Sequence, residues 1–478
     1  MHNNERHQIC RGHALRQFLA LLILTALLLA PPAALHAADS TKPAKPNIVF
    51  ILADDWGWGD LGCHGHPYLK TPNLDRLASE GTDFRQFTVA SGVCSPSRTA
   101  VLTGQFPARH SIHGHFATVQ SHVQRGMPDW LDPQAVLLPR LLQQAGYATA
   151  HYGKWHLSNI MVPDAPRPLA YGYDAYGAFN CSGPQMPVHD DVKNSIAFIQ
   201  KSHAAGKPFF INLWVHEPHT PHYPKPEFLE KFAHLENEAD RIYAAVLAHA
   251  DARIRELLAT LDRLGLRDNT LVIFSSDNGP ENTGPASRRL TEDESTGPGL
   301  GSFASVGTTG GHRGRKRSLL QGGIGVPFIA RWPGKIAAGK IDDATPITAV
   351  DLLPTFCALA GVKLPDGYRP DGVDQTEALL GKSNARRTKP IFWQWTTATK
   401  TGDTWPMLAV REANGKLLLG RETQQVELFR LPQDSFEKTN LSQQEAAEVA
   451  RLKALLDAWT ATLPKQPATN CLSSERTK

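Results

Sequence analysis

One cysteine lies in a segment whose composition suits chemistry. Cys94 is followed by Ser-Pro-Ser and Arg98, and the segment CSPSRTAVLTG runs on to Gly104. A lone cysteine before a proline is often only a small buried side chain. Here the flanking residues are small and non-periodic, and Arg98 falls where a helix should begin. A guanidinium and helix N–H groups beside a cysteine are what a nucleophile or an oxyanion site would use.

Oxygen-bearing side chains follow two apolar runs that resemble buried strands. Asp54 and Asp55 come directly after one run, and Asp277 and Asn278 come directly after another. The two aspartates could cap the next segment, but a bound cation accounts better for adjacent carboxylates that repel each other. Four oxygen donors without a histidine or thiolate favour Ca²⁺ or Mg²⁺ over Zn²⁺.

Two segments supply cationic side chains. Lys154 and His156 belong to the string GKWHL, and in isolation such a pair is usually a surface feature. Lys316 belongs to the basic run GHRGRKR, which could be a solvated face or a nucleic-acid contact. Both segments adjoin expected strands, and this position favours a role in the same site as Cys94.

Three histidines recur at intervals of three in the string HEPHTPH. They are His216, His219 and His222. This spacing could suggest a zinc site, but the two intervening prolines oppose a helix that would align the imidazoles on one face. We therefore do not interpret these histidines as zinc ligands.

The elements that must position these groups alternate along the chain. Continuous apolar runs predict buried parallel strands, and apolar residues at helical spacing predict covering helices. The predicted strands are 47–53, 148–151, 208–215, 270–276 and 326–331, and the predicted helices are 71–80, 137–145 and 238–264. Such alternation predicts an α/β fold with a large, mostly parallel sheet between helices, whose ligands bind at the carboxyl ends of the strands.

The composition changes beyond about residue 380. Segments 407–411 and 416–420 flank an Asn-Gly pair, which predicts a β-hairpin, and 443–462 reads as an amphipathic helix. We therefore divide the chain into a catalytic domain at 38–380 and a small subdomain at 381–478 with an antiparallel sheet. The Gly/Ser/Thr-rich stretch 280–311 reads as a long loop near the site.

The first 37 residues are predicted to be a secretory signal. Basic residues precede the apolar run 18–30, two prolines end the run, and small residues follow. This predicts an exported protein, periplasmic or secreted, without a stable membrane anchor. The formal net charge of the chain is +4, and the signal contributes three arginines and one glutamate, which leaves +2. A nearly neutral protein gives no electrostatic case for nucleic acid as a partner.

The string C-x-P-S-R-x-x-x-L-T-G resembles the defining motif of type I sulfatases, on an alkaline-phosphatase-like fold. The other sequence blocks of that family occur in the same order between residues 46 and 443. The resemblance implies that a maturation enzyme oxidises Cys94 to formylglycine, whose hydrate attacks the sulfur of a sulfate ester. It also implies a bound calcium ion, with magnesium less favoured. The implied metal ligands are Asp54, Asp55, Asp277, Asn278 and the modified residue 94.

The resemblance further implies roles for the basic groups. Arg98, Lys154 and Lys316 would bind the sulfate oxygens. His219, matched by the pattern P-H-x-P, would protonate the leaving alcohol, alone or with Lys316, and His216 and His222 would line the pocket. His156 would hydrogen-bond the formylglycine hydroxyl and act as the base that releases sulfate. Asn180 lies where relatives place a substrate contact, and Arg315 and Arg317 are further candidates for contacting an anionic substrate.

Two functions other than sulfate-ester hydrolysis are alternatives for this chain. A phosphoesterase of related fold normally shows a serine or threonine nucleophile and His-rich zinc sites, and neither is visible, although a formylglycine-dependent phosphonate hydrolase stays open. The other is a non-catalytic binder of sulfated glycans, which the complete set of catalytic-type residues disfavours. Because the chain resembles the arylsulfatase A and N-acetylgalactosamine-6-sulfatase branch, we expect a sulfated carbohydrate as substrate, with aryl sulfates as artificial substrates.

Overall fold

The computed structural model describes residues 45–283, 290–292, 300–302, 305–382, 387–395, 407–420 and 425–477. The predicted signal at 1–37 lies outside these residues, as does part of the predicted loop at 280–311. No helix among the described residues combines the length and apolar character needed to cross a membrane.

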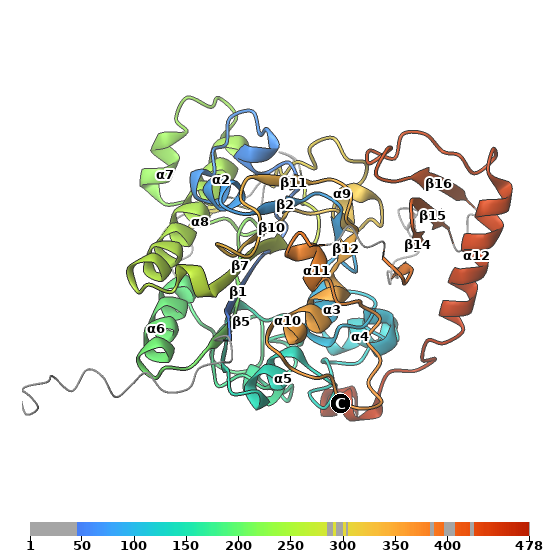
Figure 1. Ribbon diagram of the computed structural model, residues 1–478, viewed down its shortest axis with the longest axis horizontal. Coiled ribbons are helices and arrows are strands. Elements are labelled where there is room, and N and C mark those ends of the chain that lie inside the picture. The colour runs from blue at the N-terminus through green and yellow to red at the C-terminus, as the bar shows by residue number, and fades with distance from the viewer. Residues whose placement is uncertain are drawn as a thin grey trace, which may run out of the picture. The chain divides into compact units, whose positions relative to one another are not determined.

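An eight-stranded sheet forms the centre of the described chain (Figure 1). Seven strands run in one direction, and β10 alone runs antiparallel to its neighbours β7 and β2. In spatial order the strands are β11 (Lys340–Asp342), β2 (Thr82–Phe84), β10 (Phe328–Arg331), β7 (Thr270–Ser276), β1 (Asn47–Ala53), β6 (Phe209–Trp214), β4 (Ala148–Lys154) and β5 (Ala175–Phe179). The prediction of a mostly parallel sheet is confirmed.

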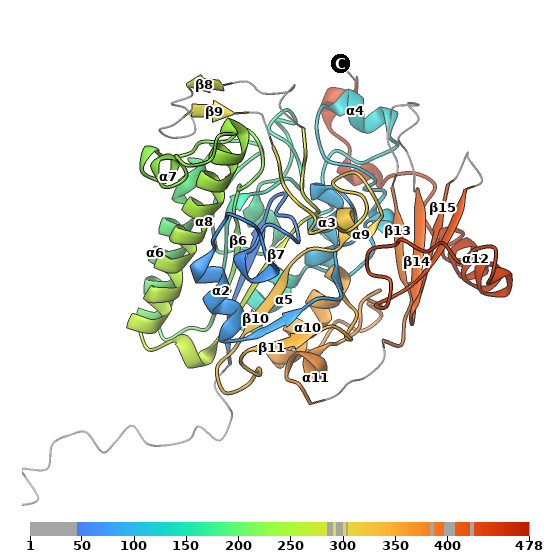
Figure 2. The same ribbon diagram turned by 90° about the horizontal axis from the view of Figure 1, so that it is seen from above.

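Helices pack on both faces of this sheet (Figures 1 and 2). One face carries α2 (Pro72–Ser79), α6 (Asp191–Ala204), α7 (Pro226–Lys231) and α8 (Glu238–Arg263). The other carries α3 (Cys94–Thr103), α5 (Leu138–Gln144) and α10 (Leu352–Leu359). The shorter elements are β3 (Phe87–Thr88), α4 (Val119–Gln124), β8 (Leu290–Glu292), β9 (Leu300–Ser302), α9 (Gln321–Ile324), β12 (Ile347–Thr348) and α11 (Thr376–Leu379).

Strand β1 shows why the sequence folds in this way. All seven of its residues are buried, and successive side chains enter opposite cores. Ile48, Phe50 and Leu52 pack on the α3 side, while Val49 and Ile51 pack on the α8 side. A continuous apolar run is required because both faces of a central parallel strand are covered.

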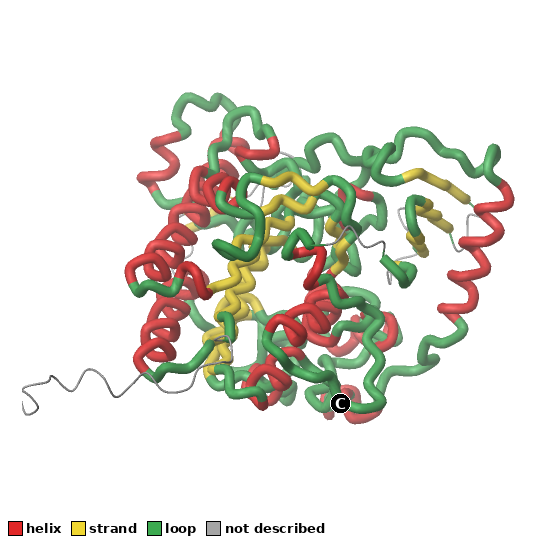
Figure 3. Tube along the Cα trace, in the orientation of Figure 1, coloured by secondary structure: helices red, strands yellow, loops and turns green. Residues whose placement is uncertain are grey.

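A smaller antiparallel sheet follows in the chain, as predicted (Figure 3). Its strands are β13 (Ile391–Gln394), β14 (Leu408–Glu412), β15 (Gly415–Leu419) and β16 (Val426–Arg430), in that order, and helix α12 (Ala446–Thr460) packs on β14 and β15. The predicted Asn-Gly turn is shifted by one residue. Glu412 pairs with Gly415, so Ala413 and Asn414 form the turn, and Ala413 adopts φ 48°.

Candidate active site

The oxygen-rich side chains gather at the carboxyl ends of two neighbouring strands. Strands β1 and β7 pair in parallel with Ala53 opposite Ser276, so the residues after each strand are adjacent. Asn278 Nδ2 donates to Asp55 Oδ1 at 2.6 Å, and the Asp55 amide donates to Asp277 Oδ1 at 3.3 Å. The sequence prediction that these carboxylates and amide share one edge of the sheet is matched by this geometry.

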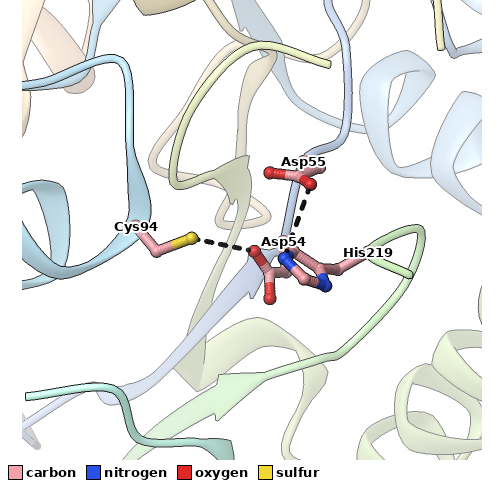
Figure 4. Close-up of side chains that lie close together, drawn as sticks. All are labelled: Asp54, Asp55, Cys94 and His219. Carbon is pink, nitrogen blue, oxygen red and sulfur yellow. Dashed lines mark hydrogen bonds and ion pairs between the residues drawn. The ribbon is translucent and has the colours of Figure 1, made fainter. Parts of the chain in front are cut away.

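Asp55 has an unusual backbone that lets adjacent aspartates converge. In an extended strand, successive side chains point to opposite faces. Asp55 instead adopts φ 69°, in the left-handed region that non-glycine residues avoid. Its carboxylate therefore faces the same space as that of Asp54, toward His219 (Figure 4). His156, Asn180 and Arg317 share this region of φ, at 54°, 56° and 73°. Such backbones cluster where function requires them.

Cys94 is the first residue of α3, and the entire helix is buried. Its Sγ lies 3.4 Å from Asp54 Oδ1 (Figure 4). The same sulfur lies 3.5 Å from Lys154 Nζ. Burial, reinforced by the charges of Asp277 and Asp54, raises the pKa of the Cys94 thiol well above its usual value. A thiol held protonated is a poor nucleophile. Cys94 is therefore held among these charged groups in its thiol form.

Arg98 is fully buried one helical turn after Cys94. Its Nε and Nη2 donate to Asp277 Oδ2 at 2.9 and 2.6 Å, and its Nη1 donates to the Lys154 carbonyl at 2.9 Å. The guanidinium also lies 5.0 Å from the ring centre of Trp214. Every nitrogen of Arg98 is thus engaged, and the side chain ties helix α3 to the ends of β7 and β4.

Lys154 and Lys316 approach the two aspartates from separate elements. Lys154 Nζ, at the end of β4, forms an ion pair with Asp54, and Lys316 Nζ donates to Asp55 Oδ2 at 2.6 Å. Burial opposes the charged form of both amines. The carboxylates, Asp54 for Lys154 and Asp55 for Lys316, outweigh it and raise both pKa values. Both side chains therefore carry positive charge beside Cys94.

His156 is oriented by a backbone carbonyl. Its Nε2 lies 2.9 Å from the carbonyl oxygen of Phe116, an acceptor, so Nε2 carries the proton. Asn159 Nδ2 donates to the same oxygen at 3.0 Å, and the Phe116 amide donates to the Ser95 hydroxyl at 3.0 Å. The lone pair of His156 is therefore on Nδ1.

His219 lies in the loop between β6 and α7. Its Nδ1 contacts the Thr220 carbonyl at 2.5 Å, and its Nε2 lies 3.8 Å from Asp55 Oδ2. Burial and the charge of Lys154 hold the pKa of His219 well below its usual value. His216 and His222 instead contact the carbonyl oxygens of Pro221 and Pro218, at 3.1 and 2.8 Å.

A cavity of about 240 Å³ opens beside these groups. Its lining comprises Lys154, Phe179, Asn180, Val188, His216, His219, Thr220, Pro221 and Tyr223. Asn180, predicted as a substrate contact, thus lies at the cavity together with Lys154 and His219. Arg317 instead forms an ion pair with Glu281 at 2.5 Å, and Arg315 is exposed.

The sequence of the chain matches two families of known proteins. Residues 46–362 match the family described as Sulfatase, and residues 311–461 match the family described as N-sulphoglucosamine sulphohydrolase, C-terminal. The chain belongs to the sulfatase family, and it is a sulfuric ester hydrolase.

Individual relatives support this assignment. The chain is 33% identical to N-acetylgalactosamine-6-sulfatase from Mus musculus, over 78% of this chain and 72% of that protein. It is 31% identical to arylsulfatase A from Homo sapiens, over 75% and 72%. The crystal structure of Ps i-CgsB superposes with a TM-score of 0.73 and 26% identity, and the match covers 91% of this chain and 96% of that one.

Two groups in the site were not expected from the sequence. One is the Phe116 carbonyl that orients His156, because every residue has a carbonyl and no motif singles this one out. The other is Glu217, whose backbone carbonyl oxygen accepts from Asp54 N at 3.3 Å and whose carboxylate accepts from Arg253 Nη2 at 2.6 Å. A glutamate between two histidines in HEPHTPH was the only available signal.

Proposed function

We propose that this sulfatase releases sulfate from a sulfated carbohydrate, with residue 94 acting in an oxidised, formylglycine form and Ca²⁺ bound beside it. The observation that carries the proposal is the setting of Cys94. It lies at the N-terminus of a buried helix, between a lysine and an aspartate, with its thiol held protonated. That setting suits an anionic ester but leaves an unmodified thiol unreactive.

The residues around Cys94 fit a calcium ion. One ligand atom each from Asp54, Asp55, Cys94 and His219 lies within 4.8 Å of the others. Asn278 Oδ1 is buried beside them without a hydrogen-bond partner, which a cation would supply. Carboxylate and amide oxygens are ligands that Ca²⁺ prefers, so we assign Asp54, Asp55, Asp277 and Asn278 as its ligands, together with the modified residue 94. The bound ion would lower the pKa of a hydroxyl on residue 94 and neutralise developing negative charge.

The two lysines would hold the sulfate group. A divalent cation held by Asp54 and Asp55 would compete with Lys154 and Lys316 for those carboxylates, and would leave the two ammonium groups available to bind sulfate oxygens. Fixed positive charge there stabilises a transition state that gains negative charge on sulfate oxygens. Arg98, whose nitrogens are engaged, would act by holding Asp277. Its direct contact with sulfate stays a prediction.

The two histidines divide the proton transfers. His156 Nδ1 carries a lone pair because Nε2 donates to Phe116, so Nδ1 is the atom that can take a proton as sulfate leaves. His219 Nδ1 faces the Thr220 carbonyl and carries the proton of the neutral ring, so Nε2 would first have to take up a proton before it could pass one to the leaving alcohol. Lys316, charged and hydrogen-bonded to Asp55, is the alternative donor.

The names of relatives support a carbohydrate substrate. One is an N-acetylgalactosamine-6-sulfatase, and Ps i-CgsB has also been solved in complex with k-i-k-neocarrahexaose. Sulfate-ester and phosphonate hydrolysis can be distinguished by comparing the hydrolysis rates of a sulfate ester and a phosphonate monoester of the same alcohol. We expect the sulfate ester to react faster.

The first experiment is mass spectrometry of the tryptic peptide 86–98, from protein exported by its own host. An aldehyde at position 94 is the expected result. An unmodified thiol would exclude this mechanism and leave a binder of sulfated glycans as the better account. Detection of the aldehyde would also support the proposed maturation enzyme, and N-terminal sequencing of the exported protein tests cleavage after residue 37.

Removal of the metal tests the calcium assignment. Dialysis against a chelator should abolish sulfate release and lower the melting temperature, because an ion at 100 times its Kd stabilises the folded protein by about 2.7 kcal/mol. Ca²⁺ should restore both activity and stability, with Mg²⁺ less effective. Full activity after complete chelation, verified by elemental analysis, would contradict the assignment.

A further inference from the structure

One of the active-site lysines is carried by a segment without regular secondary structure. Lys316 lies within residues 311–320, which form turns and bends up to the start of helix α9 at Gln321. The Lys316 amide donates to the Pro280 carbonyl at 3.1 Å, which fixes the segment on one side. A charge acts on a transition state only from the right position, and a displacement of about 1 Å can lower a rate about 100-fold. The rest of the segment must therefore be held by its neighbours.

The C-terminal antiparallel sheet contacts this segment through one buried ammonium. Lys416 belongs to β15 and is fully buried. Its Nζ donates to the Leu319 carbonyl at 2.9 Å, to Gln321 Oε1 at 3.1 Å and to Glu437 Oε1 at 2.6 Å. An ammonium has three hydrogens to donate, and these acceptors take all three. Lys416 therefore joins the C-terminal sheet to the backbone that follows Lys316.

Glu437 completes the attachment from the same subdomain. Its Oε2 accepts from the Gln321 amide at 2.7 Å, and its backbone carbonyl accepts from Arg313 Nη1 at 3.2 Å. Arg313 also donates to both carboxylate oxygens of Glu427 in β16, at 2.7 and 3.1 Å. The C-terminal subdomain thus holds the segment at a residue before Lys316 and at a residue after it.

Helix α9, held in this way, packs directly on the end of β7. A Cβ at Gly279 would lie 1.9 Å from the Gly322 carbonyl oxygen, so the two backbones touch without room for a side chain. Gly279 follows Asn278, whose Nδ2 donates to Asp55 Oδ1, and Lys316 Nζ donates to the other oxygen of Asp55. A shift of α9 would therefore be passed on to the carboxylate that orients Lys316.

The buried ion pair contributes direction more than stability. The side chains of Lys416 and Glu437 are both 0% exposed. Taking two charges out of water is costly, and the attraction between them often does no more than offset that cost. The hydrogen bonds of the pair, by contrast, define where residues 319–321 lie.

We propose that Lys416 and Glu437 are positioning residues for Lys316, so that an ion pair of the C-terminal sheet sets where the active-site ammonium lies when the sulfate ester reacts. The inference rests on the proposed role of Lys316 in binding the sulfate oxygens. It adds a catalytic purpose for the C-terminal sheet, which contributes none of the residues assigned to the reaction itself.

A double-mutant cycle tests the inference. Kinetic constants for 4-nitrophenyl sulfate are measured with protein shown to carry the aldehyde at residue 94, for wild type, Lys416→Met, Lys316→Ala and the double variant. We expect Lys416→Met to lower kcat about tenfold and to change KM less than about twofold, because a displaced charge affects the transition state most. In the Lys316→Ala background the same substitution should change kcat less than about twofold, since the group that it positions is gone.

The outcomes separate the inference from the role of Lys316. An unchanged kcat in Lys416→Met, or an equal loss with and without Lys316, would overturn the inference while the loss in Lys316→Ala upheld the role of that lysine. An unchanged kcat in Lys316→Ala would overturn both.

Glu437→Gln tests the same attachment with a smaller change. Glutamine keeps the shape of the side chain but has one acceptor oxygen, so either Lys416 or the Gln321 amide loses its partner. We expect kcat to fall about three- to fivefold, and again only where Lys316 is present. An unchanged kcat in a variant that melts below wild type would count against a positioning role.

Arg331→Met is the matched control for lost stability. It removes a buried cation that pairs with Glu80 at 3.1 Å. Arg331 lies opposite Val272, away from the carboxyl end of β7 where the active site forms. The control should lower the melting temperature as Lys416→Met does, and should change kcat less than about twofold. If both variants lost kcat equally at equal melting temperatures, general destabilisation would account for the effect and the inference would fall.

Discussion

At the residue scale, the three active-site cations differ in how firmly they are held. The three guanidinium nitrogens of Arg98 bond to Asp277 and to a carbonyl, whereas each lysine ammonium pairs chiefly with one aspartate. The guanidinium is thus a fixed part of the scaffold. The lysines can exchange a carboxylate for an anionic substrate, and this difference has testable consequences.

Loss of either lysine should reduce catalysis more than binding. We expect Lys154→Ala and Lys316→Ala to lower kcat for 4-nitrophenyl sulfate by about 10²–10³-fold, the usual effect of removing one preorganised charge. Lys316→Arg should not restore the rate, because a planar guanidinium does not reproduce a point charge. Lys340→Ala, which removes a more exposed ion pair to Asp342, is the control. A loss below threefold would contradict the assigned role.

The role of His219 can be separated from that of Lys316 by varying the leaving group. A sugar alkoxide needs a proton as it departs, whereas 4-nitrophenolate does not. His219→Ala should therefore lower kcat by about 10²–10⁴-fold for a sugar sulfate, and far less for 4-nitrophenyl sulfate. An equal loss for both esters would indicate that His219 positions other groups and that Lys316 donates the proton.

The sequence predicts this site well where side-chain chemistry defines it. Cys94, Lys154 and His219 belong to distinctive strings, and the structure places all three around Asp54. The sequence is a poor guide to features of the site that depend on backbone conformation and backbone contacts. The carbonyl of Phe116 and the left-handed conformation of Asp55 both follow from how distant segments pack, and neither has a local signal.

At the scale of elements, burial decided which predictions succeeded. Strands 47–53 and 270–276 are confirmed to the residue, because covering on both faces enforces a continuous apolar run. Short strands such as β2 and β11 were not predicted, since three residues carry no period. The hairpin turn lies one residue earlier than predicted, because Gly415 pairs with Glu412 at the end of the two strands and is not part of the turn.

Strand β4 carries a buried histidine whose effect on stability should depend on pH. The rings of Trp155, Tyr173 and Trp214 surround His151 at centroid distances of 4.9–5.6 Å. Burial, assisted by the charge of Arg98, lowers the pKa of His151 to about 3. Because the folded pKa is depressed from 6.5, the neutral imidazole stabilises the fold above pH 6.5, and this contribution is lost as pH falls toward 3.

Replacement of this histidine should flatten the acid side of the stability curve. Between pH 7 and pH 4.5 we expect the wild-type protein to lose up to about 3 kcal/mol of unfolding free energy through His151 alone. His151→Phe should be spared that loss. Urea unfolding at the two pH values measures the difference, with the exposed His203→Phe as control. Parallel losses in wild type and His151→Phe would refute the effect.

At the scale of the whole chain, the last described residues connect to the active site. The C-terminus lies beside α4 (Figure 2). Arg476 Nε donates to Asp129 Oδ2 at 2.6 Å, and Ser473 N donates to the same oxygen at 2.7 Å. Asp129 Oδ1 lies 2.8 Å from His122 Nδ1, and both side chains are fully buried.

The contacts continue from His122 to the catalytic centre. His122 Nε2 accepts from the Ala117 amide at 2.7 Å. The ring proton is therefore on Nδ1, which donates to Asp129 Oδ1. Ala117 follows Phe116, whose carbonyl accepts from His156 Nε2. A series of hydrogen bonds and adjacent residues thus connects Arg476, near the end of the chain, to His156, which is assigned to release sulfate.

Loss of this connection should lower turnover without abolishing folding. Arg476→Ala removes charge-assisted bonds to a buried carboxylate, which should cost about 1–3 kcal/mol of stability. If Phe116 then shifts, kcat should fall about five- to tenfold while KM stays constant, since His156 acts after substrate has bound. Arg476→Lys should recover part of kcat, and Arg451→Ala, which removes exposed ion pairs on α12, should change neither parameter. A destabilised Arg476→Ala protein with unchanged kcat would show that the C-terminal segment stabilises the fold but does not position His156.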